Sequence, residues 1–173
     1  MKKLTIVILC IASFYSCDRI NQKIAIKHND AVIEASDKVV FAFDKLNKAL
    51  ATFNPDSIDI ALAAYNLQVN NSILDLNKVV SLNDTSLKVG TREMLHVFKS
   101  VGDNEFKQIS TIYHIPDSLY TEKEEKEVTD IATAIDEKIE AAQLKQQNAQ
   151  KAFAKKFNFE LLFDKDSLKT KPH

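Results

Sequence analysis

The sequence predicts an all-α protein, an up-down-up-down four-helix bundle that follows an N-terminal lipoprotein signal peptide. The chain of 173 residues contains two glycines, three prolines and no tryptophan. So few turn-forming residues favour long helices, because a β-rich fold of this length needs many more turns. Four long segments with apolar residues at helical spacing are separated by short turn signals, as expected for a bundle of antiparallel neighbours.

The first 16 residues have the features of a bacterial export signal. Lys2 and Lys3 precede a mostly apolar run, residues 4–15, and the small Ser16 follows this run. The apolar run is too short to cross a bilayer, which needs about 20 apolar residues. We therefore predict that residues 1–16 are removed and that the mature protein is exported.

Cys17 is the predicted site of lipid attachment. The segment Phe14-Tyr15-Ser16-Cys17 resembles a lipobox, in which the cysteine is diacylated and the chain is then cleaved before it. The alternative is an ordinary signal peptide cut near Ser16, with Cys17 left as a free thiol. Lipidation predicts a protein anchored to the cell envelope, with the outer membrane favoured and the periplasmic or surface side left open. Residues 17–20 would form a short tether.

The composition of the mature chain excludes several classes of function. Cys10 leaves with the signal and Cys17 carries lipid, so no cysteine remains for a disulfide, a zinc site or an iron-sulfur cluster. Removing residues 1–16 takes away two lysines and no acidic residue, which leaves 21 basic and 24 acidic residues. This balance gives no electrostatic footprint for nucleic acid.

The bundle is predicted to occupy residues 21–163, and its first helix to cover residues 20–53. Apolar residues recur there every seven positions, with alanines at the complementary heptad position, which predicts a seam for packing against other helices. The seam residues are Val32, Val39, Leu46 and Phe53, and the alanines are Ala35, Ala42 and Ala49.

Turn signals then divide the rest of the chain into three more helices. Asn54 as N-cap and Pro55 at the first helical position start a second helix that ends near Leu82. Asp84 is the predicted cap of a third helix, which stops before Pro116, and Gly102 lies in it as a point where it could kink or break. The residues predicted to face inward on these two helices are Ile58, Leu62, Tyr65, Val69, Ile73, Leu76, Val80, Leu87, Met94, Leu95, Phe98, Val101, Ile109 and Ile112.

The fourth helix has the clearest start, because Thr121 and Glu124 form the pattern of a capping box. Its predicted inner face is Val128, Ile131, Ile135, Ile139, Ala142, Ala149, Phe153 and Phe157. After it, residues 158–163 form an apolar tail expected to pack on the bundle. Residues 164–173 are charged and predicted to be disordered.

Three segments carry a resemblance to a known family. They are NDTSLK (83–88), DNEFKQI (103–109) and AQKAFAKKFNFEL (149–161), and they resemble an uncharacterised family of helical surface lipoproteins of spirochaetes and Bacteroidota. The resemblance covers most of the mature chain. It implies a helical fold and lipid anchoring, and it brings no catalytic residues.

Glu105 falls among apolar residues of the third helix, so its carboxylate needs partners. Counting back from the turn at residue 83 places Glu105 near Leu62 and Gly102 near Tyr65. We predict a buried polar pair in which the Tyr65 hydroxyl donates to Glu105 through the gap left by Gly102. The alternative is that Glu105 lies at the edge of the apolar stripe and reaches water. Ser72 and Gln146 are two further polar residues on apolar faces.

Two patterns in the sequence contain residues that can ligate a metal or haem. Glu93 and His96 have the Glu-x-x-His spacing of di-iron bundles, but such sites need two copies, and helical geometry points both residues to solvent. His28 and Met94 are the only pair that could ligate haem, and the covalent attachment motif is absent. The prediction is no metal and no cofactor, with His28 a capping or edge residue.

Three Asp-Ser-aliphatic triplets look like the O-glycosylation pattern of exported Bacteroidota proteins, with Ser57, Ser118 and Ser167 as acceptors. The alternative is helix-start chemistry, because Asp and Ser also cap helices.

We find none of the motifs that mark common enzymes: the sequence predicts no Ser-His-Asp arrangement, and it has no phosphate-binding glycine loop, HExxH motif or paired-carboxylate cleft. We therefore predict a non-enzymatic, membrane-anchored structural or interaction module that binds a protein or another surface ligand. The alternative is a carrier bundle that holds an apolar ligand or haem between its helices.

Overall fold

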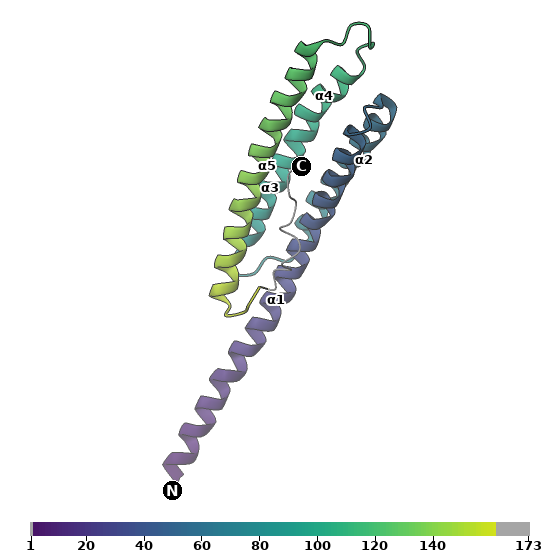
Figure 1. Cartoon of the computed structure of the whole chain (residues 1–173). Coiled ribbons are helices and arrows are strands. Elements are labelled where there is room, and N and C mark those ends of the chain that lie inside the picture. The colour runs from purple at the N-terminus through teal and green to yellow at the C-terminus, as the bar shows by residue number, and fades with distance from the viewer. Residues whose placement is uncertain (1, 162–173) are drawn as a thin grey trace.

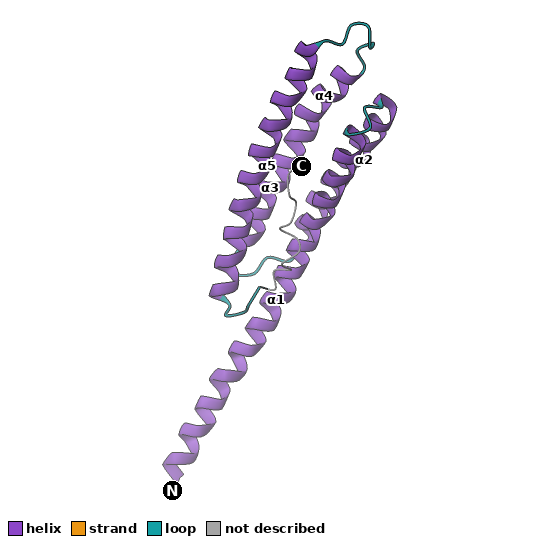
Figure 2. Ribbon diagram, in the orientation of Figure 1, coloured by secondary structure: helices purple, strands orange, loops and turns teal. Residues whose placement is uncertain are grey.

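The computed structural model describes residues 2–161, with side chains described from residue 21 onward. Over this range the chain forms helices and loops and no strand (Figure 2). The helices are α1 (Lys2–Leu50), α2 (Pro55–Lys78), α3 (Ser86–Asp103), α4 (Glu105–Tyr113) and α5 (Glu122–Lys156). The predicted all-α fold and the helical bundle are confirmed.

The helices pack lengthwise, and α1 extends beyond the others toward the N-terminus (Figure 1). α1 packs mainly on α2 and α3 mainly on α5, while α3 also contacts α1, α2 and α4. The turn between α1 and α2 and the loop between α4 and α5 lie at the end of the bundle remote from the N-terminus (Figure 1). We call this end the distal end.

The heptad seam of the first helix is confirmed at Val32, Val39 and Leu46, which are fully buried, and wrong at Phe53. α1 ends at Leu50, and Phe53 lies in the following turn with a left-handed backbone (φ 53°), so its side chain is 69% exposed. Val80 is a second wrong assignment, because α2 ends at Lys78 and Val80 is exposed beyond it.

The caps predicted for α2 and α5 are confirmed, and the cap predicted for the third helix is wrong. The N-cap of α3 is Thr85, while Asp84 Oδ1 accepts a hydrogen bond from the Ser86 amide. The Asn54 side chain accepts a hydrogen bond from the Ser57 backbone amide, and Pro55 begins the helix. Thr121 and Glu124 form a capping box at the start of α5. These contacts satisfy backbone amides that a helix start otherwise leaves without partners.

The predicted third helix is divided in two at Asn104, two residues after Gly102. Asn104 has φ −116° and ψ −76°, and its side-chain amide donates to the Ser100 carbonyl. This break settles the question left open at Gly102. It also buries Phe106, which the sequence pattern had not placed in the core.

The predicted packing of the apolar tail is confirmed over its described part. The Phe159 ring lies 6.1 Å from that of Phe153, and the Phe159 amide donates to the Ala154 carbonyl. The predicted disordered tail, residues 164–173, lies outside the described residues, as do the side chains of the predicted signal peptide and of Cys17.

Candidate functional site

A hollow of about 370 Å³ opens at the distal end of the bundle, and we call it the distal hollow. Three segments far apart in the sequence build it: the turn after α1, the end of α4 with the loop that follows, and the first turn of α5. Its lining residues are Phe53, Tyr113, Ile115, Asp117, Tyr120 and Glu125. Four of these six residues are aromatic or aliphatic, and the other two, Asp117 and Glu125, supply carboxylates.

Local backbone structure fixes the aromatic side chains of the distal hollow. The left-handed turn at Phe53 directs this ring across to Tyr113, with the ring centroids 5.6 Å apart and the ring planes perpendicular. The Pro116 carbonyl accepts hydrogen bonds from the amides of Leu119 and Tyr120, which closes the loop before α5. An edge-to-face ring pair of this kind favours a defined geometry over free rotation.

The electrostatics of the distal hollow favour a positively charged group. Burial raises the pKa of Tyr113, and the neighbouring Tyr120 adds to the shift. Burial also raises the pKa of Tyr120, followed by the negative charges of Glu125 and Glu124. Both hydroxyls therefore stay protonated at neutral pH, while aromatic faces and carboxylates both attract cations.

The prediction of no Ser-His-Asp arrangement is wrong, because Ser110, His114 and Asp59 meet between α2 and α4. The Ser110 hydroxyl donates to Asp59 Oδ1, and His114 Nε2 lies 3.3 Å from Asp59 Oδ2. His114 Nδ1 lies 2.9 Å from the Ser110 carbonyl oxygen. Because the serine hydroxyl is bonded to the carboxylate and not to the imidazole, this geometry does not activate a nucleophile. It serves to connect α2 to α4.

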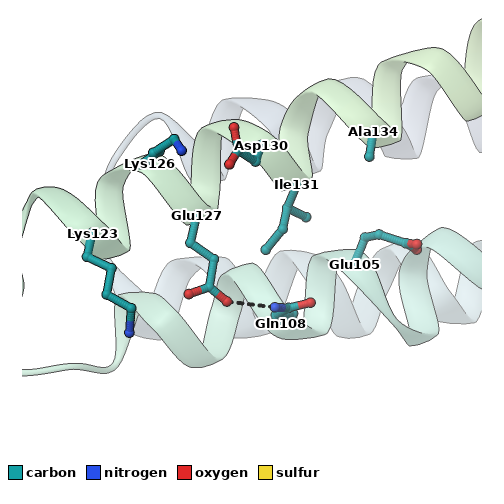
Figure 3. A pocket seen from close by; sticks show the side chains of 8 residues that line it. All are labelled: Glu105, Gln108, Lys123, Lys126, Glu127, Asp130, Ile131 and Ala134. Atoms are coloured by element: carbon teal, nitrogen blue, oxygen red, sulfur yellow. Dashed lines mark hydrogen bonds between the residues drawn. The ribbon is translucent and has the colours of Figure 1, made fainter.

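A second hollow, of about 510 Å³, lies between α4 and α5 (Figure 3). Gln108 Nε2 donates to Glu127 Oε1 at 2.8 Å across this groove, and Ile131 points into it. Charges of both signs line it, from Lys123, Lys126, Glu127 and Asp130. Because positive and negative side chains are mixed on this open surface, it does not concentrate one sign of charge, and none of its lining groups is placed as a nucleophile beside a general base.

The predicted hydrogen bond from Tyr65 to Glu105 is wrong. The Tyr65 hydroxyl donates to the Phe98 carbonyl at 2.7 Å, and Glu105 Oε1 pairs with Lys138 of α5. Because the helix breaks at Asn104, α4 turns Glu105 toward α5, and the single hydroxyl proton of Tyr65 is already used. The predicted closeness of Gly102 and Tyr65 is confirmed, since a Cβ at Gly102 would lie 2.7 Å from Tyr65 Cε1.

The other polar residues on apolar faces have varied surroundings. Ser72 is fully buried and accepts from Gln68 Nε2 at 3.2 Å, and Gln146 is buried. The second oxygen of Glu105, Oε2, is buried without a hydrogen-bond partner.

The candidate metal and haem residues do not come together as a site. Glu93 and His96 are exposed, and Glu93 pairs with Lys145 at 2.6 Å. Met94 is buried in the core, and His28 is buried against Phe153 with ring centroids 5.5 Å apart. Within residues 21–161, no group of three or more His, Cys, Asp or Glu side chains is placed to hold a metal.

His28 makes stability depend on pH. Burial lowers its pKa from 6.5, Lys88 also lowers it, and the Val80 backbone and Asp84 oppose the shift. His28 therefore binds a proton more strongly in the unfolded chain than in the folded protein. The folded state keeps its full stability above about pH 6.5 and loses stability as the pH falls below that value. We expect the melting temperature to fall between about pH 7.5 and 5.5, and His28→Gln to reduce this slope.

The exposed His96 provides the matched control for that measurement. His96→Gln should change the melting temperature little at any pH, because His96 is exposed and a surface substitution removes no packing contact. An equal change of slope in the two variants would contradict the assignment to His28.

The three predicted glycosylation sites differ in what the structure shows of them. Ser57 and Ser118 are both exposed, Ser57 in the first turn of α2 and Ser118 in the loop before α5. Ser167 lies outside the described residues.

Comparison with protein-family models, with curated protein sequences and with solved structures found no match for the chain. None of the helices in the described part of the chain combines the length and the apolar character needed to span a membrane.

The distal hollow is built mostly from loops, and it was not predicted from the sequence. Periodicity identifies the faces of helices, whereas five of the six lining residues lie in turns or at the end of α4. The available signal was Tyr120, because an aromatic ring in the turn before the fourth helix has no helix face to explain it. Phe53 gave no such signal, since it continued the heptad seam of the first helix.

Proposed function

We propose that the protein is a non-enzymatic lipoprotein of the bacterial envelope that binds a partner at its distal hollow. The predicted acylated Cys17 lies on the N-terminal part of α1, and the same helix runs from there to the distal end (Figure 1). An anchor at one end and an aromatic hollow at the other suit a module that presents a binding site away from a membrane. The aromatic hollow is the observation that supports binding most strongly.

In this proposal the helical bundle acts as a rigid spacer between the membrane anchor and the distal hollow. We interpret it as an up-down-up-down bundle in which α3 and α4 together form the third member. The outer membrane is the favoured location, and the resemblance to helical surface lipoproteins stays a prediction that agrees with it. Removal of residues 1–16 and lipid on Cys17 belong to the same proposal.

The proposed ligand is a basic side chain on the surface of another envelope protein. Tyr113, Tyr120 and Phe53 offer ring faces, and Asp117 and Glu125 supply negative charge. A cation held against aromatic rings gains about 0.5–2 kcal/mol per contact, depending on how far it is removed from water. An Arg or Lys side chain combines the apolar stem and the positive head that such a wall accepts.

Membrane fractionation tests the anchor. We expect Cys17→Ala to move the protein from the membrane fraction to the soluble fraction, because the acyl chains cannot be attached. The wild-type protein should label with a palmitate analogue, and the variant should not. Retention of the unlabelled variant in membranes would contradict anchoring through Cys17.

Capture of the tagged protein from its own membranes in mild detergent tests the distal hollow. We expect a stoichiometric partner with the wild-type protein, and its loss in Phe53→Ala and Glu125→Gln. Phe41→Ala is the matched control, because Phe41 is also an exposed ring (61%) and lies nine residues, about 14 Å along the helix, before the end of α1 at Leu50. Equal loss in Phe41→Ala would contradict binding at the hollow, and absorbance of the eluate would reveal haem if the bundle were a carrier.

A further inference from the structure

The outward face of α2 is apolar and has no partner within the described part of the chain. Ile60, Leu67 and Leu74 are 73%, 62% and 57% exposed. They are spaced seven residues apart, so they form one line along the helix. The core-facing residues Ile58, Leu62, Tyr65, Val69, Ser72 and Leu76 lie on the opposite side of the same helix.

No charged residue occurs between positions 60 and 74, although 27% of the whole chain is charged. The residues that flank the apolar line are small or neutral: Ala63, Ala64, Asn70 and Asn71 are all exposed. A solvated helix face normally carries charged side chains. This face, which we call the α2 stripe, instead has the composition of a helix-packing seam.

The charges at the two ends of the α2 stripe are opposite in sign. Asp56 lies four residues before Ile60, and Lys78 lies four residues after Leu74. Both fall close to the line of the stripe at 100° per residue. Lys78 pairs with Asp75 at 2.9 Å, but this pair is exposed, and such pairs contribute little to stability. Lys78 can therefore change partner at small cost.

The α2 stripe is symmetric about Leu67. Ile60 and Leu74 lie seven residues to either side of it, and Asp56 and Lys78 lie eleven residues to either side. A second copy turned end to end would therefore place Ile60 against Leu74 and Asp56 against Lys78, with Leu67 against Leu67. A parallel copy would instead place like charges together at both ends. The pattern is complementary to itself only in the antiparallel orientation.

We propose that the α2 stripe binds a second copy of this chain, with the two α2 helices antiparallel and related by a two-fold axis beside Leu67. The small side chains Ala63 and Ala64 allow the two helices to approach closely. The apolar line loses its contact with water, and the end charges fix orientation and register.

The two N-termini of such a pair point in opposite directions, because α1 runs antiparallel to α2 and extends beyond the bundle (Figure 1). If both copies carry lipid on Cys17, the pair would join two facing membranes, and this consequence alone rests on the proposed anchor. Pairing itself is measured in detergent and does not depend on the lipid.

Light scattering during size-exclusion chromatography of the full chain in mild detergent tests the pairing. We expect a dimer for the wild type, and a dissociation constant raised at least about 100-fold by Leu67→Glu, because two carboxylates would meet at the centre. Leu144→Glu, at a similarly exposed leucine (55%) on α5, should leave the dimer intact. A monomeric wild type, or equal loss in Leu144→Glu, would overturn the proposal.

Charge reversal tests the orientation. Asp56→Lys and Lys78→Asp should each weaken the dimer about tenfold, and the double variant should recover it, because opposite charges then meet again. Thermal melts of every variant separate loss of pairing from loss of folding. Single variants without effect, or a double variant no better than either single one, would exclude the antiparallel arrangement.

Discussion

Replacing Phe106 by Ala is expected to lower the free energy of unfolding by about 3–5 kcal/mol, because the change leaves a large cavity among rings that cannot close over it. Phe106 is 2% exposed, and its ring lies 5.7 Å from both Phe43 and Tyr65. Phe98 is the fourth ring of this cluster, 5.7 Å from Phe43. The four aromatic residues come from α1, α2, α3 and α4, so one substitution loosens the packing of four helices.

Urea denaturation of the full chain in detergent, followed by circular dichroism, measures this effect. Phe41→Ala removes an exposed ring of the same size and should change the free energy of unfolding by less than about 0.5 kcal/mol. A Phe106→Ala variant as stable as Phe41→Ala would show that the aromatic cluster does not hold the helices together.

The core of the long helices could be predicted from periodicity alone. Val32, Val39 and Leu46 were assigned inward because they recur every seven residues, and they are fully buried. The assignments that failed lie just past helix ends. α1 ends at Leu50, three residues before Phe53, and Phe53 itself has a left-handed backbone (φ 53°), so the helical phase used to place Phe53 had already been lost.

The break at Asn104 explains why Phe106 and the partner of Glu105 could not be predicted. A continuous third helix would place Glu105 in line with Val101 and Ile109. The irregular backbone at Asn104 rotates α4 relative to α3, so that Phe106 turns into the core and Glu105 reaches Lys138. A glycine near a helix centre signals a possible break, but the new rotation depends on tertiary packing that no local pattern contains.

The distal hollow was missed for a related reason. Residues 53 and 113–120 meet only because the helices before them end at the same end of the bundle. Apolar periodicity and turn residues predict the helix lengths and the turns that bring these segments together. They do not predict the backbone conformation of each turn residue, such as the left-handed Phe53, and this conformation decides which way each ring points.

Gly102→Ala is expected to lower the free energy of unfolding by about 1–3 kcal/mol, although alanine is the better helix former. The added Cβ would lie 2.2 Å from Asn66 Oδ1 and 2.7 Å from Tyr65 Cε1. The Asn66 amide is the end of a flexible side chain and can move away. The Tyr65 ring is fully buried, and its hydroxyl is bonded to the Phe98 carbonyl, so the strain falls on this ring.

Gly90→Ala is the comparison within the same helix, because the nearest contact of its Cβ would be Ala149 Cβ at 3.0 Å. We expect it to cost less than Gly102→Ala, and a reversed order would contradict the clash with Tyr65.

A double-mutant cycle tests whether the hydrogen bond from the Tyr65 hydroxyl to the Phe98 carbonyl prevents the Tyr65 ring from moving away from the methyl group that Gly102→Ala adds. Tyr65→Phe alone should cost about 1 kcal/mol, the usual value of one hydrogen bond. In the Tyr65→Phe background the ring is free to shift, so Gly102→Ala should cost less than it does in the wild type. Purely additive costs would place the restraint in the packing of Phe43, Phe98 and Phe106 around the ring rather than in its hydrogen bond.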